Sequence, residues 1–475
     1  MIRNDALMTD LYQLTMGNGY IKCGTADKIA VFDIFYRKKD KLSYAIMAGL
    51  EQAVDYLLNT KFCDDDIQYL RSLGIFEEEF LTRLKNFKFH GDVYAVPEGT
   101  VIFPSEPILT VVAPIIEAQY VETYLLTIIN HQTLIATKAS RMAYCTDGGI
   151  SEFGLRRAQG GDAGIYGARA ALIGGCVSTS NVLAGKMFNM PVSGTHSHSW
   201  VMSFPDELTA FRAYANTYPT SCLLLVDTYD TVTSGVPNAI TVFKELAAKG
   251  HRPIGIRIDS GDLAYLSKFA RKALDDAGFP DAKIVVSNDI DENILISLKE
   301  QGARIDLWGI GTKLITSYDT PALGGVYKLA AIEDDEGNLV PKMKISNAYE
   351  KITNPGLKKI MRIYDKATGK AQVDLIMLRD EELDVTKPLT VFHPEQTWKR
   401  MTLTDYYAEE INTKLIEKGK LLKPLPSIKE ICAHKKQSFD SFDDEYKRIN
   451  NPHIYKVDLS ERLYELKQRL LLANG

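Results

Sequence analysis

The spacing of apolar residues changes character along the chain. From residue 91, "GDVYAVPEGTVIFPSEPILTVVAP" contains short β-rich runs separated by Pro and Gly, a pattern typical of antiparallel strands. The next segment carries apolar residues at 120, 121, 124, 125, 128, 129, 135 and 136, which is the i, i+3, i+4 spacing of a long amphipathic helix. We predict that this helix links two domains.

From about residue 150, short apolar runs alternate with helical stretches. One such stretch, "SGDLAYLSKFARKALDDAG", has Ser260 as its candidate N-cap and Gly278 as its candidate C-cap. Repeated βα units predict a parallel sheet, and seven or eight in succession favour a barrel over an open sheet, which stays an alternative. The candidate strands are "SEFGL", "GGCVS", "MPVSGT", "CLLLVD", "PIGIRID", "AKIVVSN", "RIDLWGI" and "VYKLAAI".

We therefore expect an α/β protein of three domains. Residues 1–145 form an N-terminal α+β domain with antiparallel strands and the long linking helix. Residues 146–335 form an irregular, TIM-like parallel α/β barrel that holds the active site. Residues 336–475 form a peripheral C-terminal extension, because the chain there becomes more charged ("EDDEGN", "DKATGK") and ends in the helical pattern "LSERLYELKQRLLLANG".

Composition and charge narrow the class of protein. The 56 Lys and Arg residues against 61 Asp and Glu residues leave a net charge of −5, and no basic block is present, so we do not expect a nucleic-acid partner. The N-terminus lacks the apolar core of a signal peptide, and no run of eighteen apolar residues occurs. We expect a cytoplasmic protein without a membrane partner. The six cysteines show no CxxC pairing, which argues against a disulfide framework or a zinc ribbon.

In a parallel barrel the active site gathers at the carboxyl ends of the strands, so the polar residues that follow each apolar run are the candidates for chemistry. These residues are Arg156 and Arg157; Ser178 to Asn181; Thr195, His196 and His198; Asp227 and Asp230; Arg257, Asp259 and Asp262; Asn288 and Asp289; and Gly309, Gly311 and Thr312.

The strand "PIGIRIDSGD" places a charged pair among apolar residues. Alternation puts Ile254, Ile256 and Ile258 on one face and Gly255, Arg257 and Asp259 on the other. One interpretation is a buried ion pair that orders the strand. The other is an arginine that binds phosphate and a carboxylate that binds hydroxyls or a metal.

Two glycine-containing segments, "WGIGTKL" and "ALGGVYKL", lie at strand boundaries, where backbone N–H groups can approach an anion closely. Together with the arginines they predict a site for a phosphorylated ligand. A third loop, "LLLVDTYDTVTSG", either binds a phosphorylated sugar or forms a plain turn in which Asp230 caps a helix.

The motif "SGTHSHSWV" carries two histidines, His196 and His198. A zinc site needs three or four protein ligands, and the other histidines lie outside the ends of the predicted strands, which argues against a metal-dependent amidohydrolase. A purely structural pair would need hydrogen-bond partners for two inward imidazoles. Because imidazole is a good nucleophile near neutral pH, we favour a histidine that accepts a phosphoryl group.

Taken in order, these motifs resemble those of the nicotinate phosphoribosyltransferase family. They are "MTDLYQLTM" (8–16), "EFGLRR" (152–157), "SGTHSHSW" (193–200), "LVDTYDT" (225–231), "IRIDSGDL" (256–263), "SNDI" (287–290), "GIGTKL" (309–314) and "GGVYKL" (324–329). The resemblance implies a type II phosphoribosyltransferase fold and a homodimer whose active sites are shared between subunits.

The resemblance also implies a reaction in NAD salvage. Nicotinate and phosphoribosyl pyrophosphate give nicotinate mononucleotide and pyrophosphate, with Mg²⁺ present and with ATP as a co-substrate hydrolysed through a phosphohistidine, as in a ligase. No residue is expected to be a dedicated metal ligand. Alternatives are a transferase for nicotinamide or another pyridine base, a metal-dependent amidohydrolase, and a non-catalytic sensor of phosphorylated nucleotides.

The resemblance assigns roles to individual residues. His198 matches the phosphorylated histidine, and the doublet leaves His196 as an alternative; His196 stands where related nicotinamide transferases carry an acid, so it would favour the nicotinate carboxylate. The other implied site residues are Tyr12 and Phe153 around the pyridine ring, with Tyr12 donated by the second subunit; Arg156 and Arg141 near the base and phosphates; Arg257 and Asp259 at the base or pyrophosphate and the ribose hydroxyls; Gly311, Thr312, Gly324 and Gly325 at the 5′-phosphate; and Thr195, Asp227 and Gly309 as further substrate-binding positions.

Overall fold

The chain forms two compact units in the computed structural model, which describes residues 5–37, 42–348 and 351–474. Residues 1–134 and 322–475 form unit 1, and residues 135–321 form unit 2. Helix α6 (Glu122–Tyr144) runs from unit 1 into unit 2, over the segment whose apolar spacing predicted a long helix. None of the described helices combines the length and the apolar character that a membrane span requires. The three domain ranges expected from the sequence stay a prediction.

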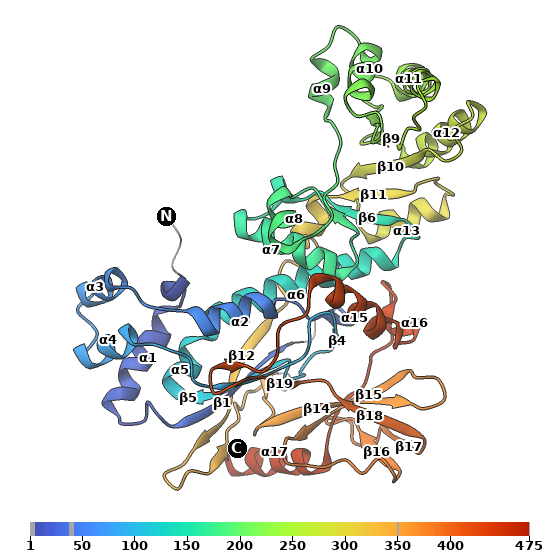
Figure 1. The fold of residues 1–475 in the computed structure, drawn as a ribbon. Helices are drawn as coiled ribbons and strands as arrows, with labels where there is room; N and C mark the ends of the chain where they lie inside the picture. Colours follow the sequence, from blue (N-terminus) through green and yellow to red (C-terminus); the bar gives the residue numbers. More distant parts are fainter. Residues whose placement is uncertain (1–4, 38–41, 349–350, 475) are drawn as a thin grey trace. The chain divides into compact units, whose positions relative to one another are not determined.

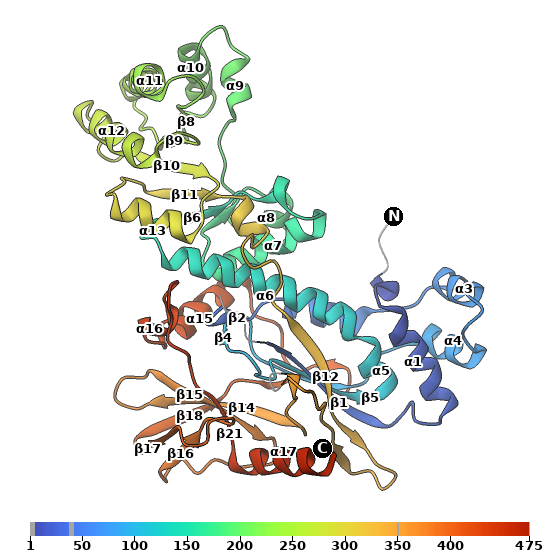
Figure 2. The same ribbon diagram turned by 180° about the vertical axis from the view of Figure 1, so that it is seen from behind.

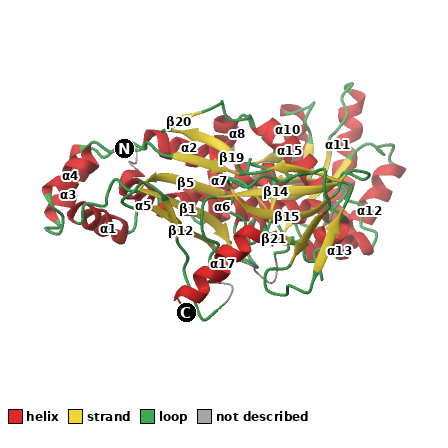
Figure 3. Ribbon diagram, turned by 90° about the horizontal axis from the view of Figure 1, so that it is seen from below, coloured by secondary structure: helices red, strands yellow, loops and turns green. Residues whose placement is uncertain are grey.

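Unit 1 is built on a seven-stranded sheet whose centre is antiparallel, as the Pro- and Gly-punctuated segment predicted. In the central strand β1, Ala30, Val31, Ile34 and Tyr36 are fully buried, and Figure 3 shows β1 between β5 and β12. The strands, in order across the sheet, are β13 (Leu339–Pro341), β12 (Gly325–Glu333), β1 (Ile29–Tyr36), β5 (Leu109–Pro114), β3 (Asp92–Ala95), β19 (Thr413–Glu417) and β20 (Lys420–Leu421).

The strand "VYKLAAI" was expected in the parallel series, and this expectation is wrong. It forms β12 and pairs antiparallel with β1, with Lys328 opposite Asp33. The physical reason lies in the connection that precedes it. A parallel strand needs a crossover that returns along the sheet, usually a helix, whereas only the single turn α14 (Thr312–Ile315) lies between β11 (Leu307–Ile310) and β12.

The rest of unit 1 consists of helices and smaller sheets. The predicted helical end of the chain is confirmed as α17 (Glu461–Asn474). A four-stranded sheet has the order β18 (Tyr406–Glu410), β14 (Lys358–Asp365), β15 (Ala371–Leu378) and β21 (Val457–Leu459); β2 (Ala45–Ile46) pairs with β4 (Val101–Ile102), and β16 (Leu389–Phe392) pairs with β17 (Arg400–Leu403). The helices are η1 (Asp5–Leu7), α1 (Leu11–Lys22), α2 (Leu50–Asn59), α3 (Asp64–Ser72), α4 (Glu78–Lys85), α5 (Ile115–Tyr120), α15 (Ile428–Asp440) and α16 (Asp444–Lys447).

Unit 2 contains the predicted parallel sheet. Its order is β7 (Ser178–Thr179), β6 (Gly149–Glu152), β11, β10 (Lys283–Asn288), β9 (Gly255–Ile258) and β8 (Leu223–Leu225), and every neighbouring pair is parallel. Figures 1 and 2 show α12 and α13 running beside β9, β10 and β11. The helices are η2 (Leu155–Arg157), α7 (Gly161–Gly174), α8 (Val182–Phe188), α9 (His198–Met202), α10 (Glu207–Thr217), the π-helical turn η3 (Thr231–Gly235), α11 (Val236–Ala248), α12 (Leu263–Asp276) and α13 (Glu292–Glu300).

The sheet of unit 2 has two ends among the described residues, so its closure into a barrel is not confirmed. The outer strands β7 and β8 form no ladder with each other. The predicted strand "MPVSGT" contributes a single parallel bridge between Val192 and Thr179 instead of a full strand. The structure shows a mixed α/β fold that contains a parallel sheet.

The predicted start of α12 is wrong by two residues. Its N-cap is Asp262, whose Oδ1 accepts a hydrogen bond from the Tyr265 N–H at 3.0 Å. Ser260 instead donates its hydroxyl to Asp227 Oδ2 at 2.6 Å, and Gly261, with φ +83°, turns the chain between the two. Gly278, with φ +89°, directly follows the C-cap Ala277, next to the predicted position.

Candidate active site

A cluster of charged side chains lies where strands β8, β9 and β10 end in unit 2. Arg257 in β9 donates from Nη1 to Ser287 Oγ at 3.2 Å and from Nη2 to the carbonyl oxygen of His196 at 2.7 Å. Its side chain is 14% exposed, and burial lowers the pKa of its guanidinium. The buried fork therefore ties the β9 and β10 strands to the histidine segment.

The carboxylate of Asp259 joins this cluster two residues farther along. Its Oδ1 accepts a hydrogen bond from Ser287 Oγ and lies 3.7 Å from Arg257 Nη1, while its backbone N–H donates to Asp227 Oδ2 at 2.9 Å. The side chain is 37% exposed. The Arg257–Asp259 pair therefore orders the strand end and still presents a carboxylate to solvent, which combines both interpretations of the sequence.

Asp227 is more enclosed than Asp259. Its Oδ2 accepts from Ser260 as well as from the Asp259 backbone, but its buried Oδ1 has no hydrogen-bond partner among the described residues. A buried carboxylate oxygen without a partner is costly, so this atom is suited to a hydroxyl or a cation supplied by a ligand. Asp230, in contrast, caps η3 by accepting from the Thr233 N–H at 2.6 Å, which is the structural role considered for it.

His198 opens helix α9 and faces the cluster. Its Nδ1 lies 3.1 Å from Thr228 Oγ1, and its Nε2 lies 3.7 Å from Asp259 Oδ2. The ring is 39% exposed. A half-exposed imidazole held between a hydroxyl and a carboxylate is well placed to react with a bound ligand.

His196 has a different environment. It is 8% exposed, its ring meets Tyr214 edge-on at 4.7 Å, and its Nε2 accepts a hydrogen bond from the Leu225 N–H of β8 at 3.2 Å. Burial lowers the pKa of this imidazole to about 4. The ring is uncharged at neutral pH and its Nε2 is already used, so this geometry does not support a direct, charge-based contact with a substrate carboxylate.

The buried His196 predicts a pH dependence of stability. In the unfolded chain this histidine titrates near 6.5, whereas in the folded chain its pKa is about 4, so the unfolded state binds more protons between these values. The free energy of unfolding should therefore fall by up to about 3 kcal/mol from this residue as the pH drops from neutral to 4. Urea unfolding at several pH values measures the slope, which should be shallower in His196→Gln than in the unchanged protein. Equal slopes in the two proteins would contradict the prediction.

Phe153 and Gly309 are paired at the end of β6 and within β11. The Phe153 N–H donates to the Ile310 carbonyl at 2.8 Å, and the Phe153 ring lies over Gly309. A Cβ at position 309 would lie 2.6 Å from the ring atoms Cδ2 and Cε2. The Phe153 ring can therefore occupy this position only because residue 309 has no side chain.

We expect Gly309→Ala to displace the Phe153 ring and to raise the KM for a stacked aromatic substrate about tenfold, with a smaller effect on kcat, because the change affects ring binding more than the reacting atoms. Steady-state kinetics with the aromatic substrate varied would measure this. Gly161→Ala is the matched control, since a Cβ at the start of α7 meets no atom within 4 Å. An unchanged KM in Gly309→Ala would show that the ring position does not matter.

The remaining predicted residues of unit 2 have varied positions. Arg156 in η2 is exposed, and Thr195 is half-buried beside His196. Gly311 is the N-cap of α14, which begins at Thr312. Arg141 is buried, and its Nε lies 3.2 Å from Glu292 Oε1. Lys138 belongs to the same ion-pair network, because its Nζ lies 2.6 Å from both Glu292 and Asp319. This network fixes Arg141 to the start of α13.

Three predicted residues belong to unit 1. Tyr12 on α1 is 46% exposed, and partial burial together with the charge of Glu122 raises the pKa of its hydroxyl to about 12. Gly324 has φ +81°, and the Gly325 N–H donates to Asn130 Oδ1 at 3.0 Å. The structure thus brings His196, His198, Asp227, Arg257 and Asp259 together within unit 2, whereas Tyr12 and the 324–325 pair belong to unit 1.

Sequence reasoning missed two polar residues of the cluster, Ser287 and Thr228. It named Asn288 and Asp289 as the residues that follow β10, but both are exposed. Strand register, which the structure supplies, places Ser287 in the cluster: Val285 lies opposite Arg257, so Ser287, two residues on, falls on the same face beside Asp259.

Over residues 5–37, 42–348 and 351–474 no group of three or more His, Cys, Asp and Glu side chains is arranged to hold a metal ion. Of the two histidines of the HxH pair, His196 already uses Nε2 to accept from the Leu225 N–H of β8, so this nitrogen is not free to bind a metal.

The chain is similar over nearly its whole length to known nicotinate phosphoribosyltransferases. It is 49% identical to "Nicotinate phosphoribosyltransferase" of Bacillus subtilis, over 98% of this chain and 96% of that protein. The crystal structure of human nicotinic acid phosphoribosyltransferase is 32% identical, with a TM-score of 0.86 over 97% of this chain and 99% of that chain. A nicotinate-nucleotide pyrophosphorylase from Pyrococcus furiosus, 20% identical with a TM-score of 0.70 over 92% of this chain and 96% of that chain, shares the fold.

Three family models match the sequence, and the second and third overlap over residues 357–384. The nicotinate phosphoribosyltransferase N-terminal domain matches residues 7–130, the nicotinate phosphoribosyltransferase family matches residues 149–384, and the nicotinate phosphoribosyltransferase C-terminal domain matches residues 357–467. The motifs that suggested the resemblance lie inside these ranges. The chain therefore belongs to the nicotinate phosphoribosyltransferase family.

Proposed function

We propose that this protein transfers the phosphoribosyl group of phosphoribosyl pyrophosphate to nicotinate and so acts in NAD salvage. The observation that carries the proposal is the cluster of Arg257, Asp259 and His198, at one edge of the parallel sheet that also bears the aromatic ring of Phe153. Membership of the family supports the assignment of substrate.

In this reaction the ring nitrogen of nicotinate attacks C1 of the ribose while the bond from C1 to pyrophosphate breaks. The transition state has oxocarbenium character, so alignment of the reactants and stabilisation of the leaving group are the main contributions of the protein. Asp259 would hold the ribose hydroxyls and Phe153 one face of the pyridine ring. Arg257 would hold the base or the pyrophosphate, and the N–H groups near Gly311 and Thr312 the 5′-phosphate.

The donor set fits a Mg²⁺ that arrives with the substrate. Asp227 Oδ1 is a buried carboxylate oxygen without a partner in the described chain, and the Asp259 backbone N–H bonds the other oxygen of this carboxylate, so that Asp259 belongs to the same cluster. Mg²⁺ in such sites is held by one or two carboxylates, water and substrate phosphates, so a cage of protein ligands is not needed. When bound, the ion supplies positive charge to the pyrophosphate.

We propose further that ATP phosphorylates His198. A ring nitrogen would attack the γ-phosphorus, the bond to ADP would break, and the phosphohistidine would later be hydrolysed. His198 is preferred over His196 because it is half-exposed and its Nε2 faces Asp259, whereas the His196 Nε2 is bonded to the β8 backbone. Phosphorylation next to the substrate cluster would tighten substrate binding.

Two structural expectations also remain proposals. In the first, residues 192–196 complete an irregular barrel wall, because Val192 bridges to β7 and His196 Nε2 accepts from β8. In the second, the protein is a cytoplasmic homodimer in which Tyr12 from the second subunit covers the pyridine ring. The exposed Tyr12, Leu11 and Met16 on α1 support this contact.

The test is pyrophosphate release from phosphoribosyl pyrophosphate and Mg²⁺, with nicotinate or nicotinamide as acceptor, each with and without ATP. Release with nicotinate, enhanced by ATP and accompanied by ADP, is expected. Release only with nicotinamide would favour the alternative transferase. Binding of the substrates without release would favour the sensor.

A further inference from the structure

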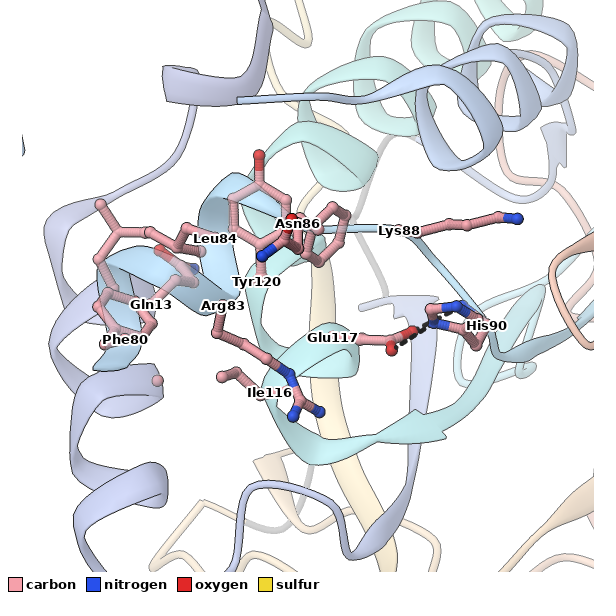
Figure 4. A pocket seen from close by; sticks show the side chains of 13 residues that line it. Gln13, Phe80, Arg83, Leu84, Asn86, Lys88, His90, Ile116, Glu117 and Tyr120 are labelled. Atoms are coloured by element: carbon pink, nitrogen blue, oxygen red, sulfur yellow. Dashed lines mark hydrogen bonds and ion pairs between the residues drawn. The ribbon is translucent and has the colours of Figure 1, made fainter. Parts of the chain in front are cut away.

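A small cavity in unit 1 is lined on one side by α1, the helix that carries Tyr12. Its volume is about 110 Å³, and it is formed by α1, by α4 with the segment that follows it, and by α5. Figure 4 shows Gln13, Phe80 and Leu84 at one end and Glu117 with His90 at the other, with Arg83 between them in this view. We propose that this cavity binds a small aromatic carboxylate, a single ring with one negative charge.

The size and the walls of the cavity select a ring. A dry cavity of about 150 Å³ in another protein binds benzene, so about 110 Å³ with an open side is suited to one ring and not to a nucleotide. Part of the wall is apolar and enclosed, since Phe80, Leu84, Ile116 and Tyr120 are all at most 6% exposed, and polar side chains line the rest. Aromatic faces of this kind favour a flat apolar ligand.

Gln13 supplies an unused donor inside the cavity. The residue is 2% exposed, and its amide Nε2 makes no hydrogen bond of normal geometry with the described residues. Its Oε1 accepts from Thr9 Oγ1 at 3.4 Å. A buried N–H donor without an acceptor is unusual in a folded protein, so an acceptor oxygen of a ligand would complete the site.

The charges around the cavity favour an anion. Arg83 and Lys88 line the cavity with one carboxylate, Glu117. The Glu117 carboxylate is already engaged, because its Oε2 accepts from the His90 backbone N–H at 2.7 Å and its Oε1 lies 3.0 Å from His90 Nδ1. The guanidinium of Arg83 is 46% exposed and bonds Asp27, which is 74% exposed. Because this ion pair is solvated and weak, a ligand carboxylate can take over part of the arginine's hydrogen bonding.

The position of Gln13 gives the site a regulatory consequence that rests on the proposed function. Gln13 lines the cavity, and its neighbour on α1, Tyr12, is exposed. A ligand that bonds Gln13 would therefore change the orientation of Tyr12. Binding itself does not depend on that role.

The experiment is titration of the full chain with benzoate, without phosphoribosyl pyrophosphate or ATP, followed by calorimetry. Phe153→Ala removes the ring proposed to bind the base, so benzoate binding that persists there is not at the base site. Gln13→Leu should weaken binding about tenfold, because a bond to the carboxylate is lost. Arg83→Gln, on the surface, should weaken it about threefold to tenfold and keeps the proposal testable if Gln13→Leu does not fold.

Gln68→Leu, on the exposed face of α3, is the control and should bind like the unchanged protein. The proposal is overturned if benzoate does not bind, if binding is lost only in Phe153→Ala, or if Arg83→Gln and a folded Gln13→Leu bind as tightly as the unchanged chain. Turnover of nicotinate is a separate measurement, so the failure of the cavity proposal and the failure of the proposed function are distinguishable.

Discussion

Arg257→Lys is expected to lower kcat/KM for the proposed transfer by about 10² to 10³, although the positive charge is kept. Arg257 spans two partners at once, donating from Nη1 to Ser287 and from Nη2 to the His196 carbonyl. A lysine presents one ammonium group without the planar fork, so it cannot hold both partners in the same geometry. The Asp259 carboxylate, which shares Ser287 with the arginine, would lose its orientation as well.

The matched control is Arg252→Lys. Arg252 lies just before the same strand, is 53% exposed and pairs with Asp281, so its replacement should leave kcat/KM unchanged. Initial rates of pyrophosphate release at varied phosphoribosyl pyrophosphate measure the effect, and thermal unfolding separates it from loss of the fold. If Arg257→Lys folds and retains its full kcat/KM, the bidentate role of Arg257 is wrong.

Much of unit 2 follows from the sequence because its signals are local. Alternation in "PIGIRIDSGD" correctly placed Ile256 and Ile258 in the core, both fully buried, opposite Arg257. The same pattern placed Ile254 with them, but Ile254, the residue before β9, is 43% exposed. Strand ends therefore limit how far alternation predicts burial.

Features that depend on distant parts of the chain were not predictable in this way. Nothing near residue 325 indicates that β12 pairs with β1, almost 300 residues earlier, because an apolar run suits either sheet. The two histidines likewise look equivalent in "THSH". What separates them is tertiary: the Leu225 N–H meets one ring, and Thr228 and Asp259 meet the other.

Because the contacts distinguish His198 from His196, we expect a second large mutational effect, on the formation of a phosphoenzyme. His198→Asn is expected to reduce the phosphate that the protein takes up from ATP labelled at the γ-position by at least about 100-fold, because the nucleophilic ring nitrogen is removed. ATP should then no longer stimulate pyrophosphate release, while slow transfer without ATP continues, since Arg257 and Asp259 remain in place.

His196→Gln is the matched variant for this experiment. A glutamine side-chain oxygen can accept from the Leu225 N–H in place of Nε2, so the fold and the phosphorylation of His198 should both persist. Label found in His198→Asn but absent from a folded His196→Gln would reverse the assignment of the two histidines. Full ATP stimulation in His198→Asn, without any label, would show that ATP acts on this protein by a route other than a phosphohistidine at position 198.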